Sequence, residues 1–189
     1  MRKVGVMGSA ADTLPRGGLA DLERRAVALG RAIAARDLAL LTGATTGVIY
    51  TVGKAAHEGG ALHVGISPAS SELEHVATYE LPTDACDLII YTGFGLKGRN
   101  VVLVRSCEIV LFIAGSMGAL NEFTIAHDEG KIIGCLTGTG GVADEAARLL
   151  QTFPKKTGAH VFHEDDPARL LDICMRKLAR QKAAWKKRR

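Results

Sequence analysis

Short apolar runs alternate with helical patterns along the whole chain of 189 residues, and this alternation constrains the fold more than any other feature. Several runs are nearly continuous in Val, Ile and Leu, which is typical of strands that are covered on both faces. The predicted strands are Lys3–Met7, Leu38–Thr42, Leu62–Ile66, Asp87–Tyr91, Ile109–Ala114, Lys131–Leu136 and Ala159–Phe162.

Apolar residues at helical spacing separate most of these runs. Leucine, alanine and isoleucine residues recur every three or four positions and predict an amphipathic helix between the first two strands: Leu19, Leu22, Ala26, Leu29 and Ile33. Ser67–Ala85 has no clear period, so we expect a loop with no more than one irregular helical turn. The other predicted helices are Gly47–Glu58, Arg99–Ser106, Gly118–Glu129, Val142–Gln151 and a segment from Pro167 onwards. This order predicts an α/β fold: one doubly wound domain with a mostly parallel sheet of about seven strands flanked by helices.

The composition, 47% hydrophobic and 23% charged, excludes collagen-like and broadly disordered chains. No run approaches the roughly 18 apolar residues that a membrane span requires, and the N-terminus leads directly into a strand, without the apolar stretch of a signal peptide. Four widely spaced cysteines form no CxxC pair: Cys86, Cys107, Cys135 and Cys174. We expect reduced thiols in or near the core of a cytoplasmic protein.

The net charge of +4 is unevenly distributed. Residues 176–189 hold eight Lys or Arg and no acidic residue, which leaves 16 basic against 20 acidic residues, a net −4, in the rest of the chain. We therefore expect a ligand-binding domain over residues 1–175 and a basic C-terminal helix end or tail over residues 176–189. Nucleic-acid binding is expected only through this tail, and no contact with a membrane is expected.

Four strand-to-helix turns are unusually rich in Gly, Ser and Thr: Gly8–Asp12, Thr42–Gly47, Thr92–Asn100 and Ala114–Glu122. In a doubly wound sheet, ligands bind beyond the carboxyl ends of the strands, where such turns gather. In the last of these turns, glycines allow a close backbone approach, and the helix that follows offers free N–H groups to a phosphate. The alternative is that the glycines serve only the geometry of the turns, and that Arg99 is a solvated surface residue.

These residues resemble a known family. The segments Thr42-Gly-Ala-Thr-Thr-Gly-Val-Ile, Glu58-Gly-Gly and Val64-Gly-Ile-Ser-Pro are similar to the second βαβ segment of the LOG (Lonely Guy) family, once labelled as lysine decarboxylases. Arg99 resembles its signature arginine, and Ala114–Glu122 resembles its motif Pro-Gly-Gly-x-Gly-Thr-x-x-Glu. The form Thr92-Gly-Phe-Gly-Leu-Lys-Gly-Arg-Asn is closer to a sister branch that includes molybdenum-cofactor carrier proteins.

The resemblance implies a Rossmann-like, usually dimeric protein that binds a nucleoside monophosphate and needs no cofactor. Active LOG members are phosphoribohydrolases: they cleave the N-glycosidic bond to give a free base and ribose 5-phosphate. Carried over by position, Arg99 and Glu122 are the catalytic pair. The expected phosphate- and nucleotide-binding residues are Gly8, Ser9, Gly43, Thr45, Thr46, Gly47, Thr92, Gly93, Asn100, Gly115, Ser116, Met117, Gly118 and Ala119.

Three residues depart from the family motif. Ala114 replaces Pro, Ser116 replaces the second Gly, and Ala119 replaces Thr, whose hydroxyl would donate a hydrogen bond to phosphate. A hydrogen bond to a charged group contributes roughly 1.5–3 kcal/mol. The departures keep open an alternative, a non-catalytic carrier or sensor of a nucleotide or of a ligand like the molybdenum cofactor.

A metal site is not expected. His160 and His163 are followed by three acidic residues, but on a strand the two imidazoles point to opposite faces, and no Cys or third His is nearby in the sequence. The motif of a P-loop ATPase is absent from the sequence as well.

Overall fold

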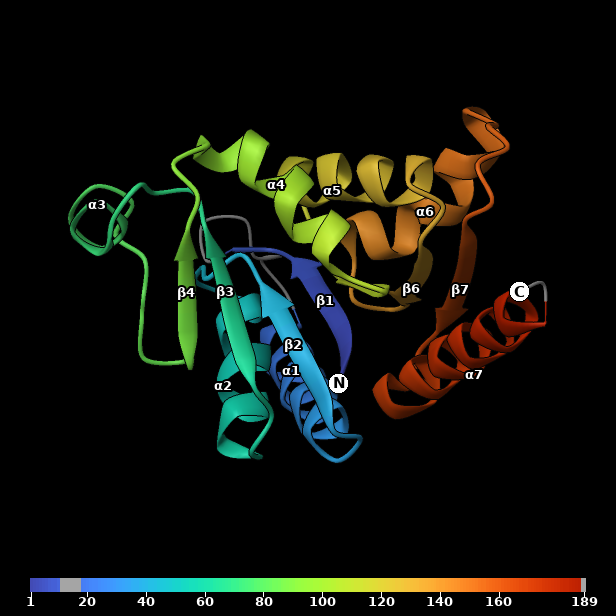
Figure 1. The fold of residues 1–189 in the computed structure, drawn as a ribbon, viewed down its shortest axis with the longest axis horizontal. Helices are drawn as coiled ribbons and strands as arrows, with labels where there is room; N and C mark the ends of the chain where they lie inside the picture. Colours follow the sequence, from blue (N-terminus) through green and yellow to red (C-terminus); the bar gives the residue numbers. More distant parts are fainter. Residues whose placement is uncertain (11–17, 188–189) are drawn as a thin grey trace.

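The computed structural model of the chain describes residues 1–10 and 18–187, and contains a seven-stranded sheet in which every pair of neighbouring strands is parallel (Figure 1). The strands are β1 Arg2–Gly8, β2 Leu38–Thr42, β3 His63–Ser67, β4 Leu88–Tyr91, β5 Ile109–Ile113, β6 Ile132–Leu136 and β7 His160–Glu164. The helices are α1 Leu19–Ala34, α2 Val48–Glu58, α3 Glu72–Ala77, α4 Gly95–Ser106, α5 Met117–Asp128, α6 Gly141–Thr152 and α7 Pro167–Lys186. The predicted α/β class and Rossmann-like architecture are confirmed.

Helices cover both faces of the sheet, which explains why several of its strands, such as β2, β5 and β6, are buried at every position. On β5, Ile109, Leu111 and Ile113 pack in one core with α1, α2 and α7, whereas Val110 and Phe112 pack in the other with α4, α5 and α6. Figure 1 shows these two helical layers on opposite sides of the sheet. No helix of the described residues is long and apolar enough to cross a membrane.

The strand order is β4-β3-β2-β1-β5-β6-β7. The chain adds strands outward from β1 to β4, then returns through α4 to place β5 on the other side of β1. The loops after β1 and β5 therefore diverge, and the crevice between them is the topological switch point at which ligands bind in such sheets.

The structure corrects the prediction for Ser67–Ala85, which contains a regular helix, α3. Ser71 is its N-cap and accepts a hydrogen bond from the Glu74 backbone N–H at 3.2 Å, while the Glu74 carboxylate accepts from the Ser70 N–H at 2.7 Å. This reciprocal arrangement is close to a capping box, whose Ser-x-x-Glu pattern was present in the sequence.

Helix α4 begins at Gly95, four residues before the predicted start at Arg99. Gly93, Gly95 and Gly98 lower the intrinsic helix propensity, so the segment has the composition of a loop. Packing of Leu103 and Val104 in the core stabilises the helix in spite of these glycines. The earlier start places Lys97 and Arg99 on one helix, directly over the switch point.

Candidate nucleotide site at the switch point

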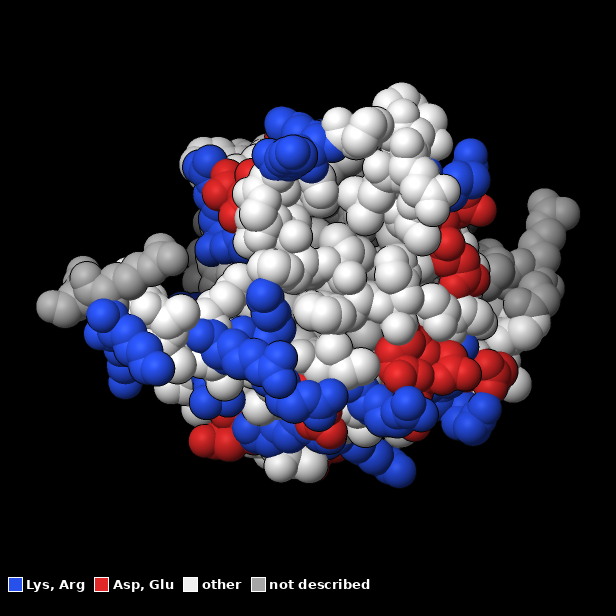
Figure 2. Space-filling model, turned by 90° about the vertical axis from the view of Figure 1, so that its right-hand side faces the viewer, with Lys and Arg blue, Asp and Glu red and all other residues white. Residues whose placement is uncertain are grey.

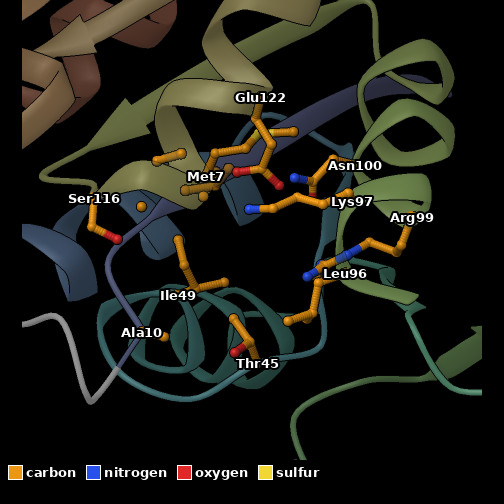
Figure 3. A pocket seen from close by; sticks show the side chains of 15 residues that line it. Met7, Ala10, Thr45, Ile49, Leu96, Lys97, Arg99, Asn100, Ser116 and Glu122 are labelled. Atoms are coloured by element: carbon orange, nitrogen blue, oxygen red, sulfur yellow. The ribbon is translucent and has the colours of Figure 1, made fainter. Parts of the chain in front are cut away.

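A cavity of about 260 Å³ opens at the carboxyl ends of β1, β2 and β5. The end of β1 contributes Gly8 to its lining, and the turn after β2 contributes Gly43 and Thr45. Helix α4, helix α5 and the N-cap residue of α5 contribute Arg99, Asn100, Ser116, Gly118, Ala119 and Glu122. In Figure 3, Lys97 and Arg99 extend toward the cavity from α4, Glu122 extends from α5, and Thr45 and Ile49 lie on the opposite side.

The other predicted site residues do not line this cavity. Met117 is 74% exposed, Gly115 packs against Ala119 and Val142, and Thr46 and Gly47 border a separate shallow hollow beside α2. Thr92 and Gly93 shape the turn before α4, where the Thr92 hydroxyl donates to the Ser67 carbonyl oxygen at 2.7 Å. The predicted turn Gly8–Asp12 continues through residues 11 and 12, which lie outside the described residues.

Ser9 is buried, and its hydrogen bonds join three loops. Its hydroxyl oxygen accepts from the Gly115 N–H at 3.0 Å, and its carbonyl oxygen accepts from the Val48 N–H at 3.1 Å. The turns after β1, β2 and β5 are thereby linked. Ser9 shapes the cavity by fixing its walls.

Arg99 is 7% exposed, which excludes the alternative of a solvated surface arginine. Its guanidinium lies against Gly43: a β-carbon built on that glycine would be 1.6 Å from Arg99 Nη1. Within the described part of the chain, Arg99 Nε has no hydrogen-bond partner. Burial lowers the pKa of Arg99, although the charge of Glu122 opposes this shift. An arginine remains cationic even so, and this one is poised to bind an anion.

A buried polar network fixes the turn that carries Gly43. His63 Nδ1 faces the Ala85 carbonyl oxygen, so Nδ1 carries the proton and Nε2 accepts from the Thr42 hydroxyl at 2.8 Å. The Thr42 oxygen in turn accepts from the Ala44 N–H at 3.2 Å. Burial lowers the pKa of His63, which keeps the ring neutral and this pattern intact.

Glu122 is buried on the first turns of α5, and burial raises the pKa of its carboxyl to about 7 despite the charges of Arg99 and Lys97. The Asn100 amide lies beside it. With the nitrogen turned toward Glu122, this amide donates to Glu122 Oε1 at 3.1 Å and to the Leu96 carbonyl oxygen at 3.0 Å, and its oxygen faces Asn121 at 2.8 Å. A carboxyl with this pKa can give or take a proton near neutral pH.

The raised pKa of Glu122 predicts that the stability of the protein depends on pH. The folded protein holds the Glu122 proton up to about pH 7, whereas the unfolded chain loses it near pH ~4.3, so stability should fall as the pH rises between these values. We expect Glu122→Gln, which cannot ionise, to unfold with a free energy about 3 kcal/mol higher than the wild type at pH 8 and nearly equal at pH 4. Urea unfolding at both pH values measures this difference. An equal effect at both would contradict the assignment.

The N-terminus of α5 faces the cavity with uncapped backbone groups. Its N-cap, Ser116, makes no side-chain hydrogen bond to the first turn, and a β-carbon on Gly118 would meet nothing within 4 Å. Free N–H groups and the positive end of the helix dipole favour an anion here.

Ala114, just before this turn, replaces the proline of the family motif. Its φ of 53° is one that proline cannot adopt, so the replacement accompanies a different backbone conformation.

Lys97 lies in the first turn of α4 and lines the cavity, whereas lysines of flexible loops usually face solvent. Its charge acts to lower the pKa of Glu122. Met7, Ile49 and Leu96 form an apolar part of the cavity wall, and none of the three was predicted to belong to the site. Only their positions in the sequence could have indicated this role, because each lies in or beside one of the turns that form the site.

The described residues contain no group of three or more His, Cys, Asp or Glu side chains placed to hold a metal ion. His160 and His163 are both on β7, three positions apart and therefore on opposite faces of that strand. The four cysteines are free thiols, and all but Cys86 are buried.

The fold and this cavity define a Rossmann-like α/β protein with a polar site at the switch point of its sheet. The chain belongs to the SLOG cluster4 family, whose model matches residues 1–171. An uncharacterized protein of Archaeoglobus fulgidus is 31% identical over 129 residues, which cover 68% of this chain and 78% of that protein.

Two solved structures show the same fold. The X-ray structure of TM1055 has a TM-score of 0.81 at 24% identity and covers 93% of this chain and 99% of its own. The molybdenum cofactor carrier protein of Chlamydomonas reinhardtii has a TM-score of 0.74 at 24% identity and covers 94% and 98%. The resemblance to LOG-like proteins and to the carrier branch is thus confirmed, and at these identities the structural likeness establishes the fold alone.

Proposed function

We propose that this protein binds a nucleoside 5′-monophosphate at the switch point and hydrolyses its N-glycosidic bond, releasing the free base and ribose 5-phosphate. The observation that carries the proposal is that one small cavity brings three features together. They are the buried Glu122 carboxyl, whose pKa is about 7, the buried Arg99, and the uncapped start of α5. Among the described residues, Arg99 Nε has no hydrogen-bond partner.

The phosphate of the ligand binds at the N-terminus of α5, where Ser116, Gly118 and Ala119 line the cavity. This position places the ribose beside Glu122, one turn further along the same helix. Lys97 and Arg99 reach in from α4 and balance the negative charge of the ligand.

In the reaction, the Glu122 carboxylate accepts a proton from water as the water oxygen forms a bond to C1′. The bond between C1′ and the base nitrogen breaks, and its electron pair leaves with the base, which takes up a proton. The carboxylate also stabilises the positive charge that develops on the ribose, and Arg99 stabilises the negative charge that develops on the leaving group.

The proposal includes a homodimer in a reducing, cytoplasmic compartment. Phe94, Leu96 and Met117 are exposed apolar side chains on the elements that form the cavity, and a second copy would cover them. The free thiols of the four cysteines support a reducing compartment. Sedimentation of the purified chain would measure its assembly.

Incubation with a panel of nucleoside 5′-monophosphates tests the proposed reaction. We expect one or more of them to release free base and ribose 5-phosphate, detected by chromatography. Binding across the panel without base release would refute hydrolysis and favour the second candidate, a carrier or sensor of a nucleotide-like ligand. That candidate is favoured by Ala119, which offers no hydroxyl to a phosphate, and by the fold shared with a molybdenum cofactor carrier protein.

Introducing a hydroxyl at position 119 tests whether the cavity binds a phosphate group beside this residue. We expect Ala119→Thr to bind ribose 5-phosphate about 10- to 100-fold more tightly than Ala119→Val, because the two side chains have similar shape and only threonine donates a hydrogen bond to the charged group. Calorimetric titration of both variants measures the ratio. Equal affinities would show that no phosphate lies beside this residue.

A further inference from the structure

Helix α7 and its C-cap residue, Lys187, carry a straight basic stripe with spacings of seven, four and seven residues: Arg169, Arg176, Arg180 and Lys187. At 3.6 residues per turn, these four positions fall within about 40° of one another around the helix axis. The buried residues of α7, among them Leu170, Leu171, Cys174 and Leu178, lie on the opposite side. The stripe therefore points directly away from the sheet, and all four side chains are exposed.

The stripe is long. Eighteen residues separate Arg169 from Lys187, which at a rise of 1.5 Å per residue corresponds to about 27 Å. Figure 2 views the side of the molecule that carries β7 and α7. Its Lys and Arg side chains gather across the lower part of that face, with a few Asp and Glu side chains among them and an acidic cluster at one end. Such a row of cations matches an extended polyanion better than it matches a single small anion.

The charges of the stripe are weakly neutralised. Arg169 forms an ion pair with Glu164 at 3.3 Å. Asp172, which lies one turn from Arg176, is held by Arg36 at 2.7 Å. Beyond Asp172 the sequence contains no further acidic residue.

Two like-charged pairs lie one turn apart on the same helix: Arg176 with Arg180, and Lys182 with Lys186. Such pairs destabilise an isolated helix. Attraction to the negative end of the helix dipole accounts for basic residues in the last turn only. It accounts for Lys186 and Lys187. Lys182 pairs with Glu108, and Asp172 lies close enough to interact with the charge of Arg176, which leaves Arg180 without an acidic partner among the described residues.

We propose that the α7 stripe binds the phosphate backbone of nucleic acid, without sequence preference. Three of its four members are arginines, which bind phosphate in a bidentate manner. An anionic membrane surface fits less well, because the apolar side of α7 through Leu178 is buried in the core and cannot insert into lipid. The site is separate from the switch-point cavity, so it stands independently of the proposed reaction.

Binding can be followed through Trp185, the single tryptophan of the sequence, which is 55% exposed near the end of α7. The probes are oligodeoxythymidine and a mixed-sequence DNA duplex, titrated into the full chain. With four phosphate contacts, log K should fall with log salt at a slope of about −2.8 for the single strand and about −3.6 for the duplex, so affinity should drop about 50- to 150-fold between about 50 and 200 mM salt. Both probes should bind with similar dependence on salt.

The double variant Arg176→Gln/Arg180→Gln should halve the slope and reduce the loss over the same salt range to about tenfold. The matched control, Arg24→Gln/Arg148→Gln, removes two exposed arginines that pair with acidic neighbours on α1 and α6, and should keep the full slope. Absence of binding, an equal loss in both double variants, or binding to phosphatidylserine vesicles but not to DNA would overturn the proposal.

Discussion

Glu122→Gln should lower the rate of base release by about 10²- to 10⁴-fold, the usual contribution of a general base. Glutamine keeps the shape of the side chain and can still accept the hydrogen bond from Asn100, so the loss isolates the ability to take a proton. Because only the deprotonated carboxylate can accept a proton, kcat/KM of the wild type should rise with pH to a plateau above about pH 7. Chromatography of the released base across pH measures both effects.

The control for this variant is Glu145→Gln, an exposed carboxyl on α6 that pairs with Arg148. Its activity and pH profile should equal those of the wild type. A Glu122→Gln variant that kept more than a tenth of the activity would remove Glu122 from the mechanism. A rise with pH that persisted in the variant would assign the titration to another group.

Gly43→Ala should reduce base release by about 10²-fold while leaving the fold intact. The added methyl group would occupy the position of the Arg99 guanidinium, and the obstacle is the far end of a flexible side chain, so Arg99 moves and the backbone stays. A displacement of about 1 Å at a reacting group is sufficient for a loss of this size. Thermal unfolding, measured beside kcat/KM, would show whether the fold is retained.

A double-mutant cycle identifies the route of this effect. If Gly43 acts by giving room to Arg99, then Gly43→Ala should change nothing further in an Arg99→Ala background. Additive losses would contradict this explanation. They would point to a direct role for the backbone of the β2 turn in binding.

The strands were predictable because their apolar runs match burial on both faces, and observed bounds such as Ile132–Leu136 lie within one or two residues of the predicted ones. The segments that were predicted wrongly depend on local chemistry that periodicity does not register. Helix α3 begins with the capping pattern of Ser71 and Glu74. Helix α4 contains glycines that lower its propensity, and tertiary packing outweighs them.

The site was predictable as a set of turns at one edge of the sheet, and its geometry was not. Gly43 was expected to belong to an anion-binding turn, whereas its observed contact is with the Arg99 side chain, 56 residues further along the sequence. Ser9 was expected among the phosphate- and nucleotide-binding residues, and its hydroxyl oxygen instead accepts a hydrogen bond from the Gly115 backbone N–H. Contacts between loops so far apart in the sequence can be identified only once the folded structure is known.

The strand order also has a consequence for how a ligand acts on the whole molecule. The cavity has walls from both halves of the sheet: the β2 turn and α4 on one side, and the start of α5 on the other. Partial opening of either half would abolish binding. A bound ligand therefore raises the free energy of every such opening as well as that of global unfolding. At a concentration 100 times its Kd, a ligand should slow amide hydrogen exchange across both halves by up to about 100-fold, equivalent to about 2.7 kcal/mol.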